Sequence, residues 1–307
     1  NATGPFSDRV RRLDEPDAKL LLSASSGVHI VLEGRFSPPE TGLLIPQTED
    51  GRVLFLLPWL GHTLIGTTDQ PAAIEAHPKA TEEEIAYILR HVERYFALPL
   101  ARSDVLASWS GLRPLVSDPD AADTARLSRD HVINVSASGL LTIAGGKWTT
   151  YRKMAQDTVD EAQRRGALGG NKTSPTDRLM LVGGERFTPL GAAALQENYG
   201  LELDVASYLS RTYGDQAEAV ARLAQDGLGA RLAPGHSYLE AEVVYAARCE
   251  GARTSADVLA RRTRLGFLDQ SATLNAVPRV ARLLAAELGW SEAARAADAE
   301  AARLYFA

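Results

Sequence analysis

The sequence predicts an α/β protein of the α+β kind, in which a sheet-forming first half precedes an all-helical second half. Short apolar runs punctuated by glycine and proline continue to about residue 147, a pattern typical of strands. From Thr149 onward, apolar residues recur almost everywhere at helical spacing. Hydrophobic residues make up 45% of the 307, which allows a buried core and excludes a wholly disordered chain.

The strands expected in the first half are one single strand and two antiparallel pairs. The single strand is Val28–Leu32. Arg52–Leu57 and Thr63–Gly66 predict one pair, and Val132–Val135 and Leu140–Ala144 predict the other.

One strong helix interrupts these strands. Thr81 and Glu84 have the spacing of a capping box, in which each residue bonds the backbone of the other at a helix start. Apolar residues then follow at helical spacing as far as Phe96, and Pro99 predicts the end of the helix.

The second half begins with a helix from Thr149 to about Arg165. A polar, glycine-containing stretch at 166–178 predicts a linker between a first domain at 1–165 and a second at 179–307. The other helices are expected to start near Thr188, Asp204 and Asp215, to cover Tyr238–Glu250 and Ser255–Arg264, and to fill the alanine-rich region 271–305.

Composition excludes several function classes. The net charge of −6, with acidic and basic residues mixed, argues against a nucleic-acid-binding protein. The single cysteine excludes a disulfide framework and a cysteine-based zinc site, and no histidine spacing predicts a metal site. No apolar run reaches the roughly 18 residues of a membrane-spanning helix.

The most informative segment joins a strand to a helix. The strand runs into Gly145 and Gly146, which let a ligand approach the backbone closely, and Thr149 or Thr150 can cap the helix that follows. The start of a helix offers free N–H groups and a positive dipole end, and Lys147 adds a charge. This segment predicts a site for an anion or a polarised carbonyl.

The same segment is not a nucleotide-binding P-loop. That motif requires glycine at position 141 and serine or threonine at position 148, where the chain has Leu141 and Trp148. An ordinary glycine-rich turn between a strand and a helix remains the alternative.

Two arginines could complete an anion site. Arg113 is predicted to lie in a rigid turn between Gly111 and Pro114, and Arg129 just before a strand. Together with Lys147 they lie at the edges of neighbouring predicted strands, where they could converge on one phosphate or carboxylate. A surface ion pair is the alternative for any single arginine.

His29 alternates with apolar residues within its strand, so it is either a structural histidine or, beside a redox cofactor, a base for oxidising an alcohol. The run Gly66–Asp69 ends a strand in small polar residues, as either a cofactor-facing turn or an ordinary turn. The four histidines interpreted as surface residues are His62, His77, His91 and His236.

These motifs together resemble the FAD-dependent, quinone-linked glycerol-3-phosphate dehydrogenases, flavoproteins of the amino-acid-oxidase-like type. The resemblance covers essentially the whole chain, and its motifs occur in family order. They are Asn1–Gly4, Gly27–Ile30, Ile65–Asp69, Ser110–Leu115, Ser128–Asp130 and Ala144–Arg152, with Glu240–Glu242 and Leu259–Leu265 in the helical tail.

The resemblance implies oxidation of sn-glycerol 3-phosphate to dihydroxyacetone phosphate, with FAD as cofactor and quinone as the electron acceptor. The implied catalytic residues are His29 and Lys147, and the implied phosphate ligands are Arg113 and Arg129. The implied FAD-binding residues are Ala2, Thr3, Gly4, Gly145, Gly146, Lys147, Trp148, Thr149 and Thr150.

The family's glycine-rich FAD loop, of the form G-x-G-x-x-G, does not occur in this sequence. We therefore expect an incomplete FAD- and substrate-binding domain with a mixed and antiparallel sheet. We expect these 307 residues alone to bind FAD poorly and to be inactive. The resemblance also implies a cytoplasmic protein, attached peripherally to the inner face of the cell membrane, and leaves a homodimer open.

Two other functions remain as alternatives. One is a different amino-acid-oxidase-like flavoprotein that acts on an amine, and the other is a non-catalytic module that binds a partner. The paired arginines Arg113 and Arg129 favour a phosphate substrate over an amine.

Overall fold

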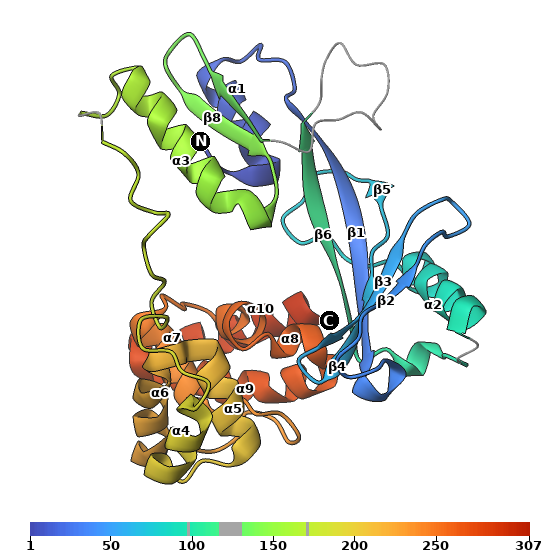
Figure 1. Ribbon diagram of the computed structural model, residues 1–307, viewed down its shortest axis with the longest axis vertical. Coiled ribbons are helices and arrows are strands. Elements are labelled where there is room, and N and C mark those ends of the chain that lie inside the picture. Colours follow the sequence, from blue (N-terminus) through green and yellow to red (C-terminus); the bar gives the residue numbers. More distant parts are fainter. Residues whose placement is uncertain (97–98, 117–130, 170–171) are drawn as a thin grey trace.

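The computed structural model describes residues 1–96, 99–116, 131–169 and 172–307. Its three parts are a six-stranded sheet flanked by one helix, a small α/β unit and a helical domain. Two long strands, β1 and β6, form the spine of the molecule. The small unit lies beside one end of this spine and the helical domain lies beside the other (Figure 1).

The six-stranded sheet is built on the twelve-residue strand β1 (Leu22–Glu33). Along one edge β1 pairs with β4 and β5, and along its other edge with β6, in each case antiparallel. The remaining strands extend the sheet in the order β2-β3-β4-β1. Their bounds are β2 Leu43–Ile45, β3 Leu54–Trp59, β4 His62–Gly66, β5 Gln70–Pro71 and β6 Ala107–Val116. The predicted antiparallel pair of β3 and β4 is confirmed.

One face of this sheet is the apolar core of the first half. Val28, Ile30 and Leu32 are fully buried and pack in one cluster with Ile85 and Ile88. The last two belong to helix α2 (Glu82–Phe96), which covers this face. Because side chains alternate along a strand, the intervening residues of β1 point to the opposite face, which α2 leaves free.

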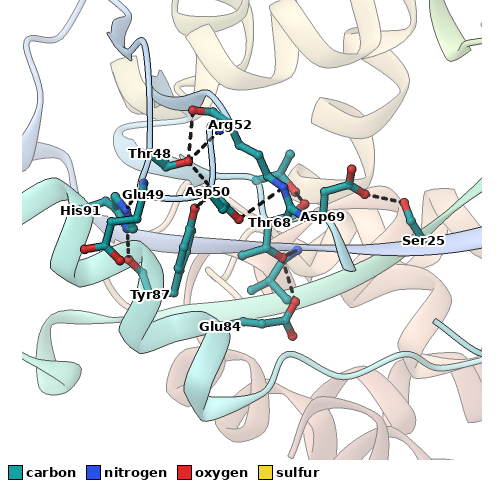
Figure 2. Close-up of polar contacts among 12 residues, drawn as sticks. Ser25, Thr48, Glu49, Asp50, Arg52, Thr68, Asp69, Glu84, Tyr87 and His91 are labelled. Carbon is teal, nitrogen blue, oxygen red and sulfur yellow. Dashed lines mark hydrogen bonds and ion pairs between the residues drawn. The ribbon is translucent and has the colours of Figure 1, made fainter. Parts of the chain in front are cut away.

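The predicted capping box of α2 is confirmed. The hydroxyl of Thr81 accepts a hydrogen bond from the Glu84 amide at 3.2 Å. In return the Glu84 carboxylate accepts from the Thr81 amide at 3.4 Å and from its hydroxyl at 3.1 Å. The other carboxylate oxygen of Glu84 accepts from the Thr68 hydroxyl at 2.8 Å, so the cap also ties α2 to the segment after β4 (Figure 2).

The predicted turn around Arg113 is wrong. Arg113 lies inside the ten-residue strand β6, where Gly111 pairs with Gly27 and Pro114 pairs with Ala24. Glycine and proline favour a turn locally, but proline is tolerated in an edge strand, and β6 pairs only with β1 among the described strands. The long pairing with β1 therefore overrides the local preference.

The small α/β unit contains the predicted hairpin of β7 and β8, which is confirmed. The start of the chain lies beside β8: the Asn1 amino group donates to the Leu141 carbonyl at 2.8 Å, and the Ile143 amide donates to the Asn1 carbonyl at 3.0 Å. The elements of this unit are a 3₁₀ turn at Gly4–Phe6, α1 Ser7–Asp14, β7 His131–Val135, β8 Leu141–Gly145, a 3₁₀ turn at Trp148–Thr150 and α3 Tyr151–Arg164.

Beyond Arg164 the next helix of the described chain begins at Gly191, and the apolar run Leu179–Val182 is largely exposed. The predicted domain boundaries stay a prediction. The α-helices of the second half are α4 Gly191–Tyr199, α5 Leu203–Tyr213, α6 Ala217–Leu223, α7 Glu240–Cys249, α8 Leu265–Leu268, α9 Gln270–Leu288 and α10 Glu292–Phe306. A π-helix at Asp257–Arg262 lies within the predicted helix Ser255–Arg264.

Aromatic side chains join the helical domain to the sheet. The ring of Trp109 in β6 lies 4.9 Å from that of Phe267 in α8 and 5.9 Å from that of Trp59 in β3, between ring centres. At the same end of β6, the Gln270 amide of α9 donates to the Leu106 carbonyl at 3.0 Å. These contacts place the helical domain against the spine, next to the face that carries His29.

Candidate functional site

The pairing of β1 with β6 brings His29 and Arg113 to the same face of the sheet. His29 pairs with Trp109 and Ser25 pairs with Arg113, so these four residues lie on the face opposite α2. Gly27 lies between His29 and Ser25 on that face and has no side chain. Same-face neighbours on a strand are about 7 Å apart, so the histidine and the guanidinium fall within reach of one small ligand.

The guanidinium of Arg113 is held by a ring of acceptors. Its Nη2 donates to the Thr67 hydroxyl at 2.9 Å and to the Thr68 carbonyl at 3.2 Å. Its Nη1 donates to the Ser26 carbonyl at 3.2 Å and to the Asp69 carboxylate at 3.1 Å. The Arg113 side chain is still 36% exposed, so it is oriented by the protein but open to solvent.

Gly27 forms the floor under this guanidinium. A Cβ atom at Gly27 would lie 2.4 Å from Nη2 and 2.7 Å from Nη1 of Arg113, and 2.6 Å from the Thr67 hydroxyl. These distances are far inside van der Waals contact, so only glycine lets the arginine lie flat across β1.

The imidazole of His29 lies on glycine as well. A Cβ at Gly66, its partner in β4, would be 2.3 Å from the ring, and the ring stacks on Trp109 with centres 5.7 Å apart. Burial lowers the pKa of His29, and the positive charge of Arg113 lowers it further, so the ring is neutral at neutral pH. Neither ring nitrogen bonds another described residue, so both remain available to a ligand.

The glycines of the β8–α3 turn adopt a backbone conformation that other residues rarely adopt. Both Gly145 and Gly146 have φ of +76°, a left-handed backbone that favours glycine. The expected threonine cap of α3 is wrong, since neither threonine side chain caps that helix. Instead Thr150 closes the preceding 3₁₀ turn: its hydroxyl accepts from the Lys147 amide at 3.3 Å and donates to the Lys147 carbonyl at 3.0 Å.

Most of the other residues expected to bind FAD are exposed. Trp148 is 85% exposed and stacks on Tyr151 with ring centres 5.3 Å apart. Ala2 and Thr3 are exposed beside β8, and the Thr3 hydroxyl donates to the Asn1 side chain at 2.8 Å. Residues Gly4 and Thr149 complete this set, and Gly4 has φ of +58°.

The other two basic residues expected at the anion site are Arg129 and Lys147. Arg129 lies outside the described residues. Lys147 is exposed at the start of the 3₁₀ turn, and its ammonium group bonds no other described side chain. The structure thus brings His29 and Arg113 together, whereas the convergence of all three basic residues stays a prediction.

The sequence alone does not reveal the role of Asp69, which ends the run Gly66–Asp69. The carboxylate of Asp69 accepts from the buried Ser25 hydroxyl at 2.6 Å and from Arg113, and Figure 2 shows the contact with Ser25. A run of small polar residues after a strand was the only local signal. The bonding partners come from strands far along the chain.

One of the four histidines interpreted as surface residues is buried. His91 of α2 is 1% exposed, with its Nδ1 2.8 Å from the Tyr87 carbonyl and its Nε2 accepting from the Glu49 amide at 3.1 Å. It faces the sheet because it lies close to Ile88 and Val92 on the apolar side of the helix. This histidine is structural.

Within the described residues, no group of histidine, cysteine and acidic side chains could hold a metal ion. None of the described helices combines the length and apolar character needed to cross a bilayer.

Known families match both halves of this arrangement. Residues 1–152 match the FAD dependent oxidoreductase family, and residues 174–295 match the C-terminal domain of alpha-glycerophosphate oxidase. The chain is similar to the family of FAD-dependent glycerol-3-phosphate dehydrogenases. The predicted flavoprotein fold with a helical C-terminal region is confirmed, and FAD is confirmed as the cofactor of the family.

Members of this family from animals match nearly the whole chain. It is 46% identical to mitochondrial glycerol-3-phosphate dehydrogenase of Homo sapiens over 313 residues, which are 99% of this chain and 43% of the human protein. The same identity and shares hold for the Bos taurus protein. The chain therefore spans less than half the length of these relatives.

A solved structure supports the same assignment. The glycerol-3-phosphate dehydrogenase of Bacillus halodurans, solved in complex with FAD, superposes with a TM-score of 0.84 at 30% sequence identity. The superposition covers 100% of this chain and 61% of the Bacillus chain.

The residues of the β8–α3 turn fit a flavin. Gly145 and Gly146 add no side chains of their own to the turn, and the side chain of Met154 packs against Gly146. The first N–H groups of the helical turns that follow have no carbonyl partner within their own helix. The exposed Trp148 offers an aromatic face beside them. Such a turn can hold the electron-rich edge of an isoalloxazine ring.

Proposed function

We propose that this chain carries the substrate-binding face and part of the FAD-binding surface of an enzyme that oxidises sn-glycerol 3-phosphate to dihydroxyacetone phosphate. The observation that supports this most directly is the placement of a neutral imidazole and an oriented guanidinium on one open sheet face. A phosphate ester of a small alcohol needs both groups, one at each end of the molecule.

The oxidation removes a hydride from C2 of the substrate and a proton from the hydroxyl group on C2. FAD, when bound, supplies the hydride acceptor. In our proposal His29 takes the hydroxyl proton on a ring nitrogen, which its lowered pKa leaves free at neutral pH. Arg113 holds the phosphate, together with Arg129. Lys147 lies near the substrate oxygens, and Ala2–Gly4 and Gly145–Thr150 contact FAD.

Substitution of Arg113 in the full-length protein tests this function. Arg113→Ala removes a charge-assisted phosphate contact worth about 1.5–3 kcal/mol, so KM for glycerol 3-phosphate should rise about 10- to 150-fold. Steady-state kinetics with a quinone analogue as acceptor would measure this rise. An unchanged KM would remove Arg113 from the phosphate site. Arg35→Ala is a matched control, because that exposed arginine follows the end of β1, where it pairs with Glu33 and lies over the Phe36 ring.

Substrate comparison separates the proposed function from the amine alternative. Turnover of glycerol 3-phosphate without turnover of glycine or sarcosine supports the phosphate substrate, and the reverse result supports an amine oxidase. Loss of both activities in a protein that still binds FAD would favour a non-catalytic module. Transfer of electrons to quinone, a homodimer and peripheral attachment to a membrane are further parts of the proposal.

A further inference from the structure

Asp69 is the charged member of the ring of acceptors around Arg113. Each Nη group of a guanidinium carries two hydrogens, and all four of these hydrogens already face protein oxygens. Three of these oxygens are neutral and belong to Ser26, Thr67 and Thr68. The fourth belongs to the Asp69 carboxylate, which neutralises the arginine.

The neutral acceptors are fixed, whereas the carboxylate is open to solvent. Thr68 is 2% exposed, and its hydroxyl joins the Val28 amide at 2.9 Å to Glu84 of α2 at 2.8 Å (Figure 2). Asp69 is 51% exposed and is held only by the Ser25 hydroxyl and Arg113 among described groups. An incoming anion should therefore displace Asp69 from Arg113 more easily than it displaces the neutral acceptors.

We propose that Asp69 competes with the substrate phosphate for Arg113 and thereby sets the affinity of the site for phosphate. This inference rests on the proposed function for the identity of the substrate. A phosphate dianion carries more charge than a carboxylate and offers three acceptor oxygens, so it displaces Asp69 from Nη1. An uncharged hydroxyl cannot replace the carboxylate without leaving the guanidinium unneutralised. The competition therefore selects phosphate esters over free polyols.

The test is Asp69→Asn in the full-length protein with FAD bound. Asparagine keeps an oxygen for Arg113 and Ser25 but removes the negative charge beside the phosphate. We expect inorganic phosphate, measured by calorimetry, to bind about three- to tenfold more tightly, with a smaller gain at high salt. The KM for glycerol 3-phosphate should fall by a similar factor, with kcat within about twofold. Weaker or unchanged phosphate binding would overturn the competition.

Three further variants make the result specific to this site. Ser25→Ala loosens Asp69 and should strengthen phosphate binding by a smaller factor. In the Arg113→Met background, Asp69→Asn should have no effect, because the group being competed for is gone. Asp50→Asn is the matched control, since Asp50 pairs with Arg52 at 3.3 Å away from β1 and should leave phosphate binding unchanged.

The two readouts separate this inference from the proposed function. Phosphate binding that responds to Asp69, in a protein that does not oxidise glycerol 3-phosphate, would support the competition and contradict the function. If the protein oxidises glycerol 3-phosphate but Asp69→Asn leaves phosphate binding unchanged, the function is supported and the competition is contradicted.

Discussion

The cluster around Arg113 on the sheet and the cluster around Glu242 in the helical domain both surround one charged side chain with several polar partners, but they differ in burial. Glu242 is fully buried: one carboxylate oxygen accepts from the Tyr208 and Tyr213 hydroxyls at 2.7 and 2.9 Å, and the other from the Leu239 amide at 2.7 Å. No ligand can reach it in the folded protein.

The open cluster, by contrast, has an exchangeable member. Arg113 and Asp69 are 36% and 51% exposed, and either can bind an ion from solution. Similar bonding thus gives different roles. A satisfied, buried carboxylate fastens α7 to α5, whereas a satisfied but exposed ion pair can be opened by a stronger anion.

The largest effect should come from Glu242→Ala. Three buried donors would lose their acceptor, and a cavity would remain, so the free energy of unfolding should fall by about 3–5 kcal/mol. Thermal or urea unfolding measures this loss. Glu197→Ala, at an exposed position of α4, is the control and should change stability by no more than about 0.5 kcal/mol. A Glu242 variant as stable as that control would mean that the cluster does not hold the helices together.

The second effect is a pH dependence of stability. Burial raises the pKa of Glu242 to about 7 from its ordinary 4.5, although its hydrogen bonds oppose this shift. Between these values the folded state keeps a proton that the unfolded state has lost. The stabilisation from this group is therefore complete below pH 4.5 and disappears as the pH rises through 7, by on the order of 3 kcal/mol.

Comparison with Glu242→Gln isolates this contribution, because glutamine does not titrate. The unfolding free energy of both proteins is measured from pH 4.5 to 8. The wild-type value minus the variant value should fall as the pH rises. A difference that is flat across this range would show that Glu242 stays ionised.

The smallest effect concerns the open cluster. Gly27→Ala places a methyl group against the guanidinium, so Arg113 should leave its acceptors, and KM for glycerol 3-phosphate should rise about tenfold, or about 1.4 kcal/mol. Folding should be retained because the guanidinium end is flexible and exposed. Gly111→Ala is the matched control. Gly111 of β6 pairs with Gly27, and a Cβ atom at Gly111 would have no atom within 4 Å, so KM should not change.

Local sequence patterns predicted much of the fold. The hairpin of β7 and β8, the pair of β3 and β4 and the capping box at Thr81 all depend on residues close together in the chain, and all three are present. The succession of a sheet-forming half and a helical half also followed from periodicity. These features need only neighbouring residues and the periods of strands and helices.

The candidate site was predicted only in part. The sequence indicates His29 and Arg113 as site residues, but it predicts a turn around Arg113 and gives no role for Asp69. Glycine and proline on either side of an arginine predict a turn. The residues close to Arg113 in the chain carry no information about the strand with which it pairs. The sequence predicts that His91 lies in a helix, but it does not predict that His91 is on the buried side of that helix.

By itself, therefore, the sequence determined which segments form strands and helices, and which residue types carry charge near them. Only the tertiary structure decided that Ser25 faces Arg113 across a strand pair 88 residues apart in the chain, with the guanidinium lying on Gly27. The physical reason is range. Helix and turn preferences act within a few residues, whereas strand register is decided by long-range pairing and by which side chains can be buried together.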